Sequence, residues 1–162
     1  MQYRKKKVSK IRFVIVDDDP TIIKMIKNII TEYNLGTVLA TCTDGISGEK
    51  TIRDMLPDIA IVDLLMPGQD GVTMIKQLQN IKSKISFVII SESRSQTLLT
   101  MAYEQGIEYY IHKPINVVEV VSVLKKTDES RKLKQFMTMV SNTATQINKQ
   151  AEKNDDASKR RI

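Results

Sequence analysis

The stretch "IAIVDLLMPGQDG", residues 59–71, decides the fold of this chain. Four apolar residues, Ile59 to Val62, run directly into one carboxylate, Asp63, and Met-Pro-Gly then makes a turn. A short, continuous apolar run is typical of a strand that is buried on both faces of a parallel sheet. The lone charge at the end of this strand needs an explanation, and the rest of the sequence supplies one.

Strand-like runs alternate with helical patterns along the chain. The expected strands are residues 11–16, 37–42, 58–62, 85–90 and 107–111. The expected helices are residues 20–33, 44–55, 71–80 and 95–105, and one more that begins after Pro114. Pro20 is typical of a first helical turn, Asp44 of a helix cap, and Gly36 and Gly106 of residues just past a helix end. This alternation predicts an α/β fold, a (βα)5 three-layer sandwich around a five-stranded parallel sheet.

Polar residues gather at one edge of the predicted sheet. The residues that directly follow the first, third, fourth and fifth strands are Asp17-Asp18-Asp19, Asp63, Ser91 and His112-Lys113. An open parallel sheet binds its ligand beyond the carboxyl ends of its strands, near the point where strand order reverses. The sequence therefore predicts that these polar side chains lie together in a single site.

The residue types at this edge suit phosphoryl transfer. The carboxylates Asp17, Asp18 and Asp63 would repel one another without a cation, and hard oxygen ligands suit Mg²⁺. A carboxylate beside a divalent ion can act as a nucleophile and form an acyl phosphate. The ammonium of Lys113 and the hydroxyl of Ser91 could each hold a further phosphoryl oxygen. The set is complete for an aspartyl-phosphate site.

Four stretches carry a family resemblance. "VIVDDDP", "IVDLLMPGQDG", "VIIS" and "YYIHKPI" resemble, in order and spacing, the signature stretches of the receiver domain of two-component response regulators, over residues 10–127. The resemblance implies strand order 2-1-3-4-5 and a cis bond between Lys113 and Pro114. It further implies the following roles: Asp63 as phosphoacceptor, Asp17 and Asp18 as Mg²⁺ ligands with the backbone carbonyl of Leu65, Ser91 as switch hydroxyl, Lys113 as phosphate-binding lysine, and Tyr110 as switch aromatic.

The function implied by the resemblance is signalling rather than enzymatic turnover. A sensor histidine kinase would phosphorylate Asp63, and Ser91 and Tyr110 would then move and repack the face made by the fourth helix, fifth strand and fifth helix. Catalysis would be limited to self-catalysed phosphotransfer and slow autodephosphorylation. Leu65 is expected to slow hydrolysis by obstructing the attacking water. Glu92 occupies a position that is usually small in the family, and could hinder small phosphodonors.

Other interpretations of the same residues remain open at this point. Asp17-Asp18-Asp19-Pro20 could be a helix cap with acids favoured by the helix dipole. "VIVDDDPT" also resembles the opening of haloacid-dehalogenase-like phosphatases, with Asp17 as nucleophile, but that interpretation leaves Asp63 without a task. A third possibility is a dimeric adaptor that works without phosphorylation.

Composition limits the classes of protein. The chain has 162 residues and a net charge of +6, and no apolar run approaches the ~20 residues of a membrane helix. The basic N-terminus lacks an adequate apolar segment and a cleavage site, so it does not fit a signal peptide. Cys42 is the single cysteine, as expected for a chain in the reducing cytoplasm. The positive charge lies at the two ends, and contact with nucleic acid through these ends alone is not favoured.

The predicted organisation is a basic tail at residues 1–10, a receiver domain at residues 11–127, a helical extension at residues 128–151 and a disordered tail at residues 152–162. The extension carries an apolar seam at steps of four and three: Leu133, Met137, Val140, Ala144, Ile147 and Ala151. We expect a homodimer through the face named above together with residues 133–151; the alternative is a helix that folds back on its own receiver. The chain also resembles regulators of the glutamine-utilisation type, in which a DNA-binding domain follows, so DNA is expected as a partner only through such a domain or another protein.

Overall fold

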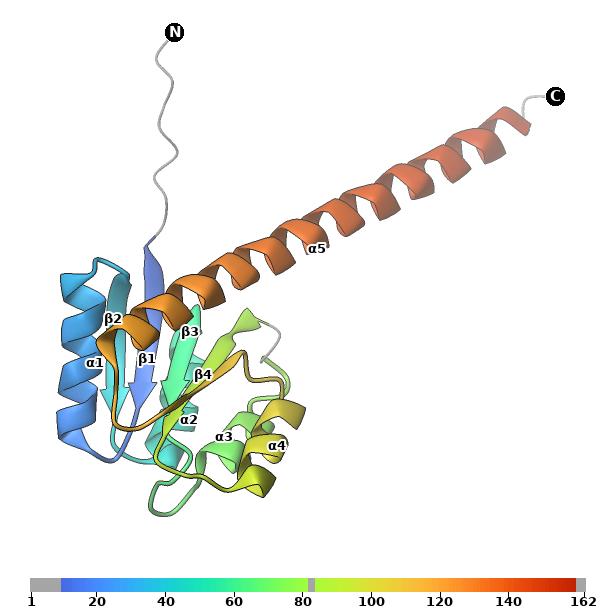
Figure 1. The fold of residues 1–162 in the computed structure, drawn as a ribbon. Coiled ribbons are helices and arrows are strands. Elements are labelled where there is room, and N and C mark those ends of the chain that lie inside the picture. The colour runs from blue at the N-terminus through green and yellow to red at the C-terminus, as the bar shows by residue number, and fades with distance from the viewer. Residues whose placement is uncertain (1–9, 82–83, 160–162) are drawn as a thin grey trace, which may run out of the picture. The chain divides into compact units, whose positions relative to one another are not determined.

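The computed structural model describes residues 10–81 and 84–159 (Figure 1). The strands are β1 (Ile11–Val16), β2 (Gly36–Cys42), β3 (Ile59–Val62), β4 (Ser86–Ser91) and β5 (Tyr109–His112). The helices are α1 (Pro20–Glu32), α2 (Gly45–Met55), α3 (Gly71–Gln77), α4 (Gln96–Glu104) and α5 (Val117–Lys159). Strands and helices alternate as the sequence predicts.

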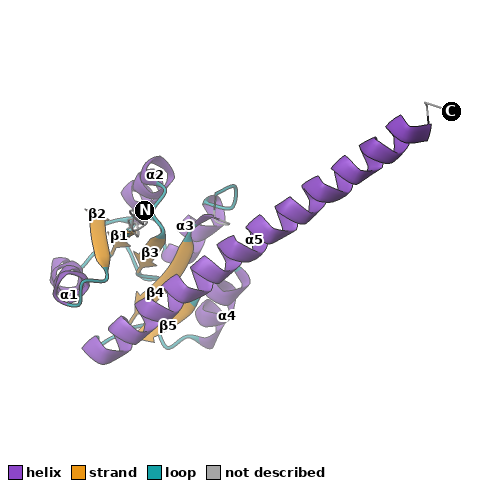
Figure 2. Cartoon of the chain, turned by 90° about the horizontal axis from the view of Figure 1, so that it is seen from above, coloured by secondary structure: helices purple, strands orange, loops and turns teal. Residues whose placement is uncertain are grey.

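The five strands form one parallel sheet. Their order is β2-β1-β3-β4-β5, as expected from the family resemblance. The order reverses between β1 and β3, which pair directly from Phe13 opposite Ile59 to Val16 opposite Val62. The carboxyl ends of β1 and β3 therefore lie side by side, and Figure 2 shows β2 at one end of the sheet and β5 at the other.

The sheet is buried on both faces, which explains why its strands have nearly continuous apolar sequences. One face packs against α1 and the first turns of α5, with core residues such as Ile15, Ile61 and Ile26. The other face packs against α2, α3 and α4, with core residues such as Val62 and Phe87. Neighbouring residues of each strand enter opposite cores because side chains alternate along a strand.

The ends of the helices follow the local sequence. Asp44 caps α2 as predicted, accepting a hydrogen bond from Ser47 N–H at 2.8 Å. Gly106 lies past the end of α4 with φ +84°, also as predicted. Gly36 does not end α1: Asn34 takes the left-handed conformation there, with φ 50°. Gly36 begins β2 instead, where a Cβ atom would lie 2.2 Å from the carbonyl oxygen of Ile11.

The chain divides into two compact units between Asp128 and Glu129. The expected disordered tail from residue 152 is wrong for the described residues, because α5 remains helical to Lys159. The predicted tail begins where the apolar periodicity of the extension stops. A helix without Pro or Gly can continue beyond that point. The basic tail predicted at residues 1–10 lies outside the described residues except for Lys10. Among the described helices, none has the length and hydropathy needed to cross a bilayer.

Candidate phosphoryl-acceptor site

Three carboxylates meet at the point where the strand order reverses. Asp17 and Asp18 follow β1, Asp63 follows β3, and one carboxylate oxygen from each lies within 4.8 Å of the others. Asp17 and Asp63 are buried, with 2% and 4% of their surfaces exposed, and Asp18 is exposed. Such a set of hard oxygen donors, open on one side, fits Mg²⁺, which binds one or two carboxylates and keeps several waters.

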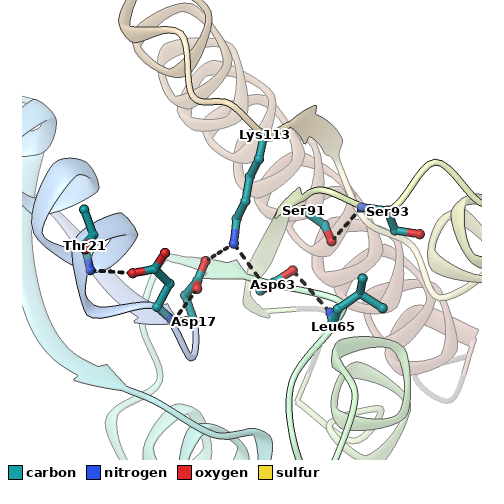
Figure 3. Close-up of polar contacts among 8 residues, drawn as sticks. Asp17, Thr21, Asp63, Leu65, Ser91, Ser93 and Lys113 are labelled. Atoms are coloured by element: carbon teal, nitrogen blue, oxygen red, sulfur yellow. Dashed lines mark hydrogen bonds and ion pairs between the residues drawn. The ribbon is translucent and has the colours of Figure 1, made fainter.

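Lys113, which follows β5, joins two of these carboxylates. Its Nζ atom lies 2.8 Å from Asp17 Oδ2 and 3.1 Å from Asp63 Oδ2, and Figure 3 shows the ammonium pointing between them. Burial alone would lower the pKa of Lys113, but the hydrogen bond to Asp17 and the charges of both carboxylates outweigh it, so the pKa is raised. Lys113 therefore stays charged. One ammonium compensates only part of three negative charges, which leaves room for a divalent cation.

Burial has the opposite consequence for an acid. The pKa of Asp17 is raised above its ordinary value because burial disfavours the carboxylate more than its hydrogen bonds to Lys113 and to the Asp19 N–H favour it. The charge of Asp63 raises the pKa of Asp17 further. Negative charge on the buried carboxylates is therefore energetically unfavourable, as expected where a cation is to bind.

The backbone holds Asp63 firmly in place. Its N–H donates to the carbonyl oxygen of Val16 at 2.9 Å, which ties the end of β3 to the end of β1. The N–H of Leu65 donates to Asp63 Oδ1 at 3.2 Å. Gly71 begins α3 directly beneath, where a Cβ atom would lie 2.3 Å from the carbonyl oxygen of Asp63. Gly71, the second glycine of "GQDG", is thus required by this close approach.

Ser91 and Tyr110 lie on the neighbouring strands β4 and β5. Ser91 is fully buried, and its Oγ atom accepts a hydrogen bond from Ser93 N–H at 3.4 Å (Figure 3). The hydroxyl of Tyr110 donates to the carbonyl oxygen of Ser93 at 2.6 Å. Burial raises the pKa of Tyr110, so its hydroxyl keeps the proton that this bond needs. Both side chains therefore engage the same loop, which connects β4 to α4.

Three neighbouring residues lie at the margin of the site. The side chain of Leu65 is 43% exposed, and Glu92 is exposed next to Ser91. His112 is exposed, and its ring contacts that of Tyr110, with 4.8 Å between the ring centroids. The bond between Lys113 and Pro114 is cis, as expected from the family resemblance.

The structure also shows what sequence reasoning missed. Ser93 contacts both Ser91 and Tyr110, but it does so through backbone atoms, so its side chain gives no signal in the sequence. The run of three aspartates serves two purposes at once. Asp19 caps α1 by accepting from Thr21 N–H at 2.8 Å, while Asp17 and Asp18 belong to the carboxylate cluster.

Comparisons with known proteins agree with this geometry. Residues 13–125 match the family model of the response regulator receiver domain. The chain is 36% identical over 137 residues to the transcriptional regulatory protein GlnL of Bacillus subtilis (strain 168), an alignment that covers 84% of this chain and 43% of GlnL. It is 28% identical over 116 residues to the chemotaxis protein CheY of the same organism, covering 72% of this chain and 96% of CheY.

A solved structure supports the same fold. The CheY-like receiver domain protein of Methanospirillum hungatei JF-1 superposes with a TM-score of 0.70 at 24% identity, covering 76% of this chain and 98% of that one. The present chain spans about half the length of two curated relatives from Bacillus subtilis (strain 168), GlnL and the probable C4-dicarboxylate response regulator DctR. Since the match to the receiver family extends over most of the residues, and the carboxylates and lysine of its signature stretches converge in one place, the chain belongs to the response regulator receiver domain family.

Proposed function

We propose that Asp63 accepts a phosphoryl group from a phosphohistidine on a sensor histidine kinase. The observation that carries this proposal is the convergence of Asp17, Asp18 and Lys113 on Asp63. In the transfer, a carboxylate oxygen of Asp63 forms a bond to phosphorus as the bond between phosphorus and the imidazole nitrogen breaks. The electron pair stays on the imidazole, which takes up a proton.

Each neighbour of Asp63 has a separate task in this proposal. Asp17, Asp18, Asp63 and the carbonyl of Leu65 would hold Mg²⁺, which when bound neutralises charge on the carboxylates and on the phosphoryl oxygens. Lys113, already 3.1 Å from Asp63, holds a second phosphoryl oxygen by charge and hydrogen bonding. The hydroxyl of Ser91 donates to a third after rotating away from the Ser93 N–H.

The switch in this proposal is the loop between β4 and α4. When Ser91 turns toward the phosphoryl group, its Oγ atom loses the hydrogen bond from the Ser93 N–H. The carbonyl oxygen of Ser93 is also the acceptor of the hydrogen bond from the Tyr110 hydroxyl. The surface formed by α4, β5 and the start of α5 then repacks between two discrete arrangements. The chain is thus a phosphorylation-controlled signalling domain, and its own catalysis is confined to phosphotransfer and slow hydrolysis at Asp63.

The direct test is electrophoresis in a phosphate-binding gel after incubation with Mg²⁺ and acetyl phosphate or a phosphorylated kinase. Wild type should show a retarded band that Asp63→Asn lacks. Asp54→Asn is the matched control, because Asp54 is an exposed acid that pairs with Lys50 on α2. A kinase donor should be included, because Glu92 could exclude acetyl phosphate.

Two results would contradict the proposal. Retained phosphorylation in Asp63→Asn, with the phosphate located on Asp17, would indicate the haloacid-dehalogenase-like chemistry that the family match does not favour. No phosphorylation of wild type by any donor would indicate an adaptor that works without phosphate.

We further propose that the output is transcription. GlnL is named a transcriptional regulatory protein, and this chain aligns with 43% of its length. Contact with DNA would then require a DNA-binding domain or a partner protein. If a fusion of this chain to the remaining part of GlnL fails to restore phosphorylation-dependent regulation in a strain lacking GlnL, this output is wrong.

Self-association is the last part of the proposal. Two surfaces are available: the face formed by α4, β5 and α5, and the apolar stripe within residues 133–151. The stripe is the better supported by observation, because its larger side chains lie exposed, among them Leu133 at 62% and Ile147 at 63%. Sedimentation of the full chain over a range of concentrations would test it, and a monomer throughout would contradict it.

A further inference from the structure

The apolar stripe on α5 is a surface that the phosphoryl-acceptor site does not use. Its members, at alternating steps of four and three residues, are Leu133, Met137, Val140, Ala144, Ile147 and Ala151. All six are exposed, and the larger side chains range from 45% exposed at Val140 to 63% at Ile147. A stripe of this period on a continuous helix is typical of pairing with another helix.

The heptad positions of the stripe disfavour a parallel pair. In a coiled coil a step of four leads from position d to position a, so Leu133, Val140 and Ile147 occupy d. The other three residues occupy a. Parallel two-stranded coils favour β-branched residues at a and Leu at d. Here the β-branched residues Val140 and Ile147 lie at d, which is the reverse arrangement.

The volumes of the side chains indicate an antiparallel pair. In a parallel, in-register pair each residue packs against its own copy, so Ala144 and Ala151 would form layers of alanine alone. Such layers leave space that close-packed interiors do not tolerate well. In an antiparallel pair position a faces position d, and the layers become Leu133 with Ala151, Met137 with Ile147, and Val140 with Ala144. Every layer then contains at least one large side chain.

Charge does not oppose this arrangement. The positions that flank the stripe are Lys134, Phe136, Ser141, Thr143, Asn148 and Gln150. Lys134 is the one charged residue among these six, so neither attraction nor repulsion across the interface selects an orientation. The orientation is therefore decided by the volumes of the side chains, which are complementary when the two copies of the stripe run antiparallel.

We propose that residues 133–151 pair antiparallel with the same segment of a second copy of this chain. The proposal rests on the self-association proposed above, but not on phosphorylation of Asp63. It requires no contact between the two receiver domains.

Cysteine cross-linking in the full chain tests the orientation. Two single-cysteine variants, Leu133→Cys and Ala151→Cys, are made in a Cys42→Ala background, and one carries a tag so that the two chains differ in size. A disulfide forms only where the two Cα atoms come within about 7 Å. In an antiparallel pair, oxidised glutathione should yield a covalent dimer in the mixture of both variants, and this band should be lost when either variant is oxidised alone. Lys149→Cys, on the opposite side of the helix, is the control for random collisions.

Each alternative result is informative. Covalent dimers in each single variant alone, with no mixed dimer, would overturn the antiparallel orientation while leaving self-association intact. A monomer of wild type by sedimentation, without cross-links above the Lys149→Cys control, would overturn self-association itself. Neither result would contradict the proposed phosphorylation of Asp63, because phosphorylation is measured in a separate experiment.

Discussion

Removing one charge from the carboxylate cluster should stabilise the protein without metal and weaken its response to Mg²⁺. We choose Asp18→Asn, because Asp18 is exposed and its ligand oxygen lies within 4.8 Å of those of Asp17 and Asp63. Two like charges at this separation repel by ~1 kcal/mol in water and by ~3.5 kcal/mol at an effective dielectric constant near 20. Since the exposure of Asp18 gives strong screening, we expect the free energy of unfolding to rise by about 1–2 kcal/mol without metal.

Magnesium should narrow or reverse the difference in unfolding free energy between Asp18→Asn and wild type. A cation at ten times its dissociation constant stabilises the folded state by about 1.4 kcal/mol, and a tenfold loss of affinity reduces this gain to about 0.4 kcal/mol. Wild type should therefore gain about 1 kcal/mol more from Mg²⁺ than Asp18→Asn does. The measurement is urea unfolding followed by circular dichroism, in a chelator and in excess Mg²⁺.

A change in net charge alone must be separated from an effect at the site. Glu32→Gln is the matched control, because Glu32 is an exposed acid at the far end of α1 from Asp19. It should alter neither the unfolding free energy nor the Mg²⁺ response appreciably. The reasoning is refuted if Asp18→Asn is less stable than wild type in chelator, or if Mg²⁺ stabilises both proteins equally.

Four further outcomes are expected. Leu65→Asn should shorten the lifetime of the phosphorylated protein, measured by loss of the retarded band, because a polar side chain no longer obstructs the attacking water; an unchanged lifetime would contradict the role of Leu65. Gly71→Ala should lower the urea midpoint, because its Cβ would lie 2.3 Å from the Asp63 carbonyl oxygen, and wild-type stability would show that α3 shifts freely. Phe87→Ala should cost about 3–5 kcal/mol of unfolding free energy, since Phe87 is 2% exposed in the core, and a loss below 1 kcal/mol would be inconsistent with that packing. Hydrogen bonds from Ser47 lower the pKa of Asp44 below 3.8, so its cap should stabilise α2 above that pH and lose its effect as the pH falls through the lowered value; a stability difference from Asp44→Ala that persists in acid would refute this.

The sequence predicted most of the fold because the relevant signals are local. Alternating apolar runs located the strands, and Asp44 and Gly106 marked helix ends through capping and backbone freedom. Boundaries were predicted less accurately at helix ends, where the backbone hydrogen-bond pattern changes without a signal in the sequence. The third helix ends at Gln77 rather than near residue 80, because hydrogen bonds there tighten, with Leu78 N–H reaching the Ile75 carbonyl.

The candidate site was predictable in composition but not in detail. The convergence of Asp17, Asp63 and Lys113 follows from the rule that parallel strands deliver their carboxyl ends to one edge. Contacts through backbone atoms, such as the Tyr110 hydroxyl on the Ser93 carbonyl, have no counterpart in a residue pattern. The extent of α5 beyond Ala151 could not be predicted from apolar periodicity, because a helix can continue after its apolar stripe ends.

The position of Lys113 bears on how quickly the site can respond. An ammonium has three N–H bonds, and in the described part of the chain two of them are directed to Asp17 and Asp63. A third acceptor can therefore join without either existing ion pair being broken. An incoming anionic group would meet a donor that is already oriented and desolvated, so little reorganisation should precede its capture, and the ends of β1, β3 and β5 would experience the new charge together.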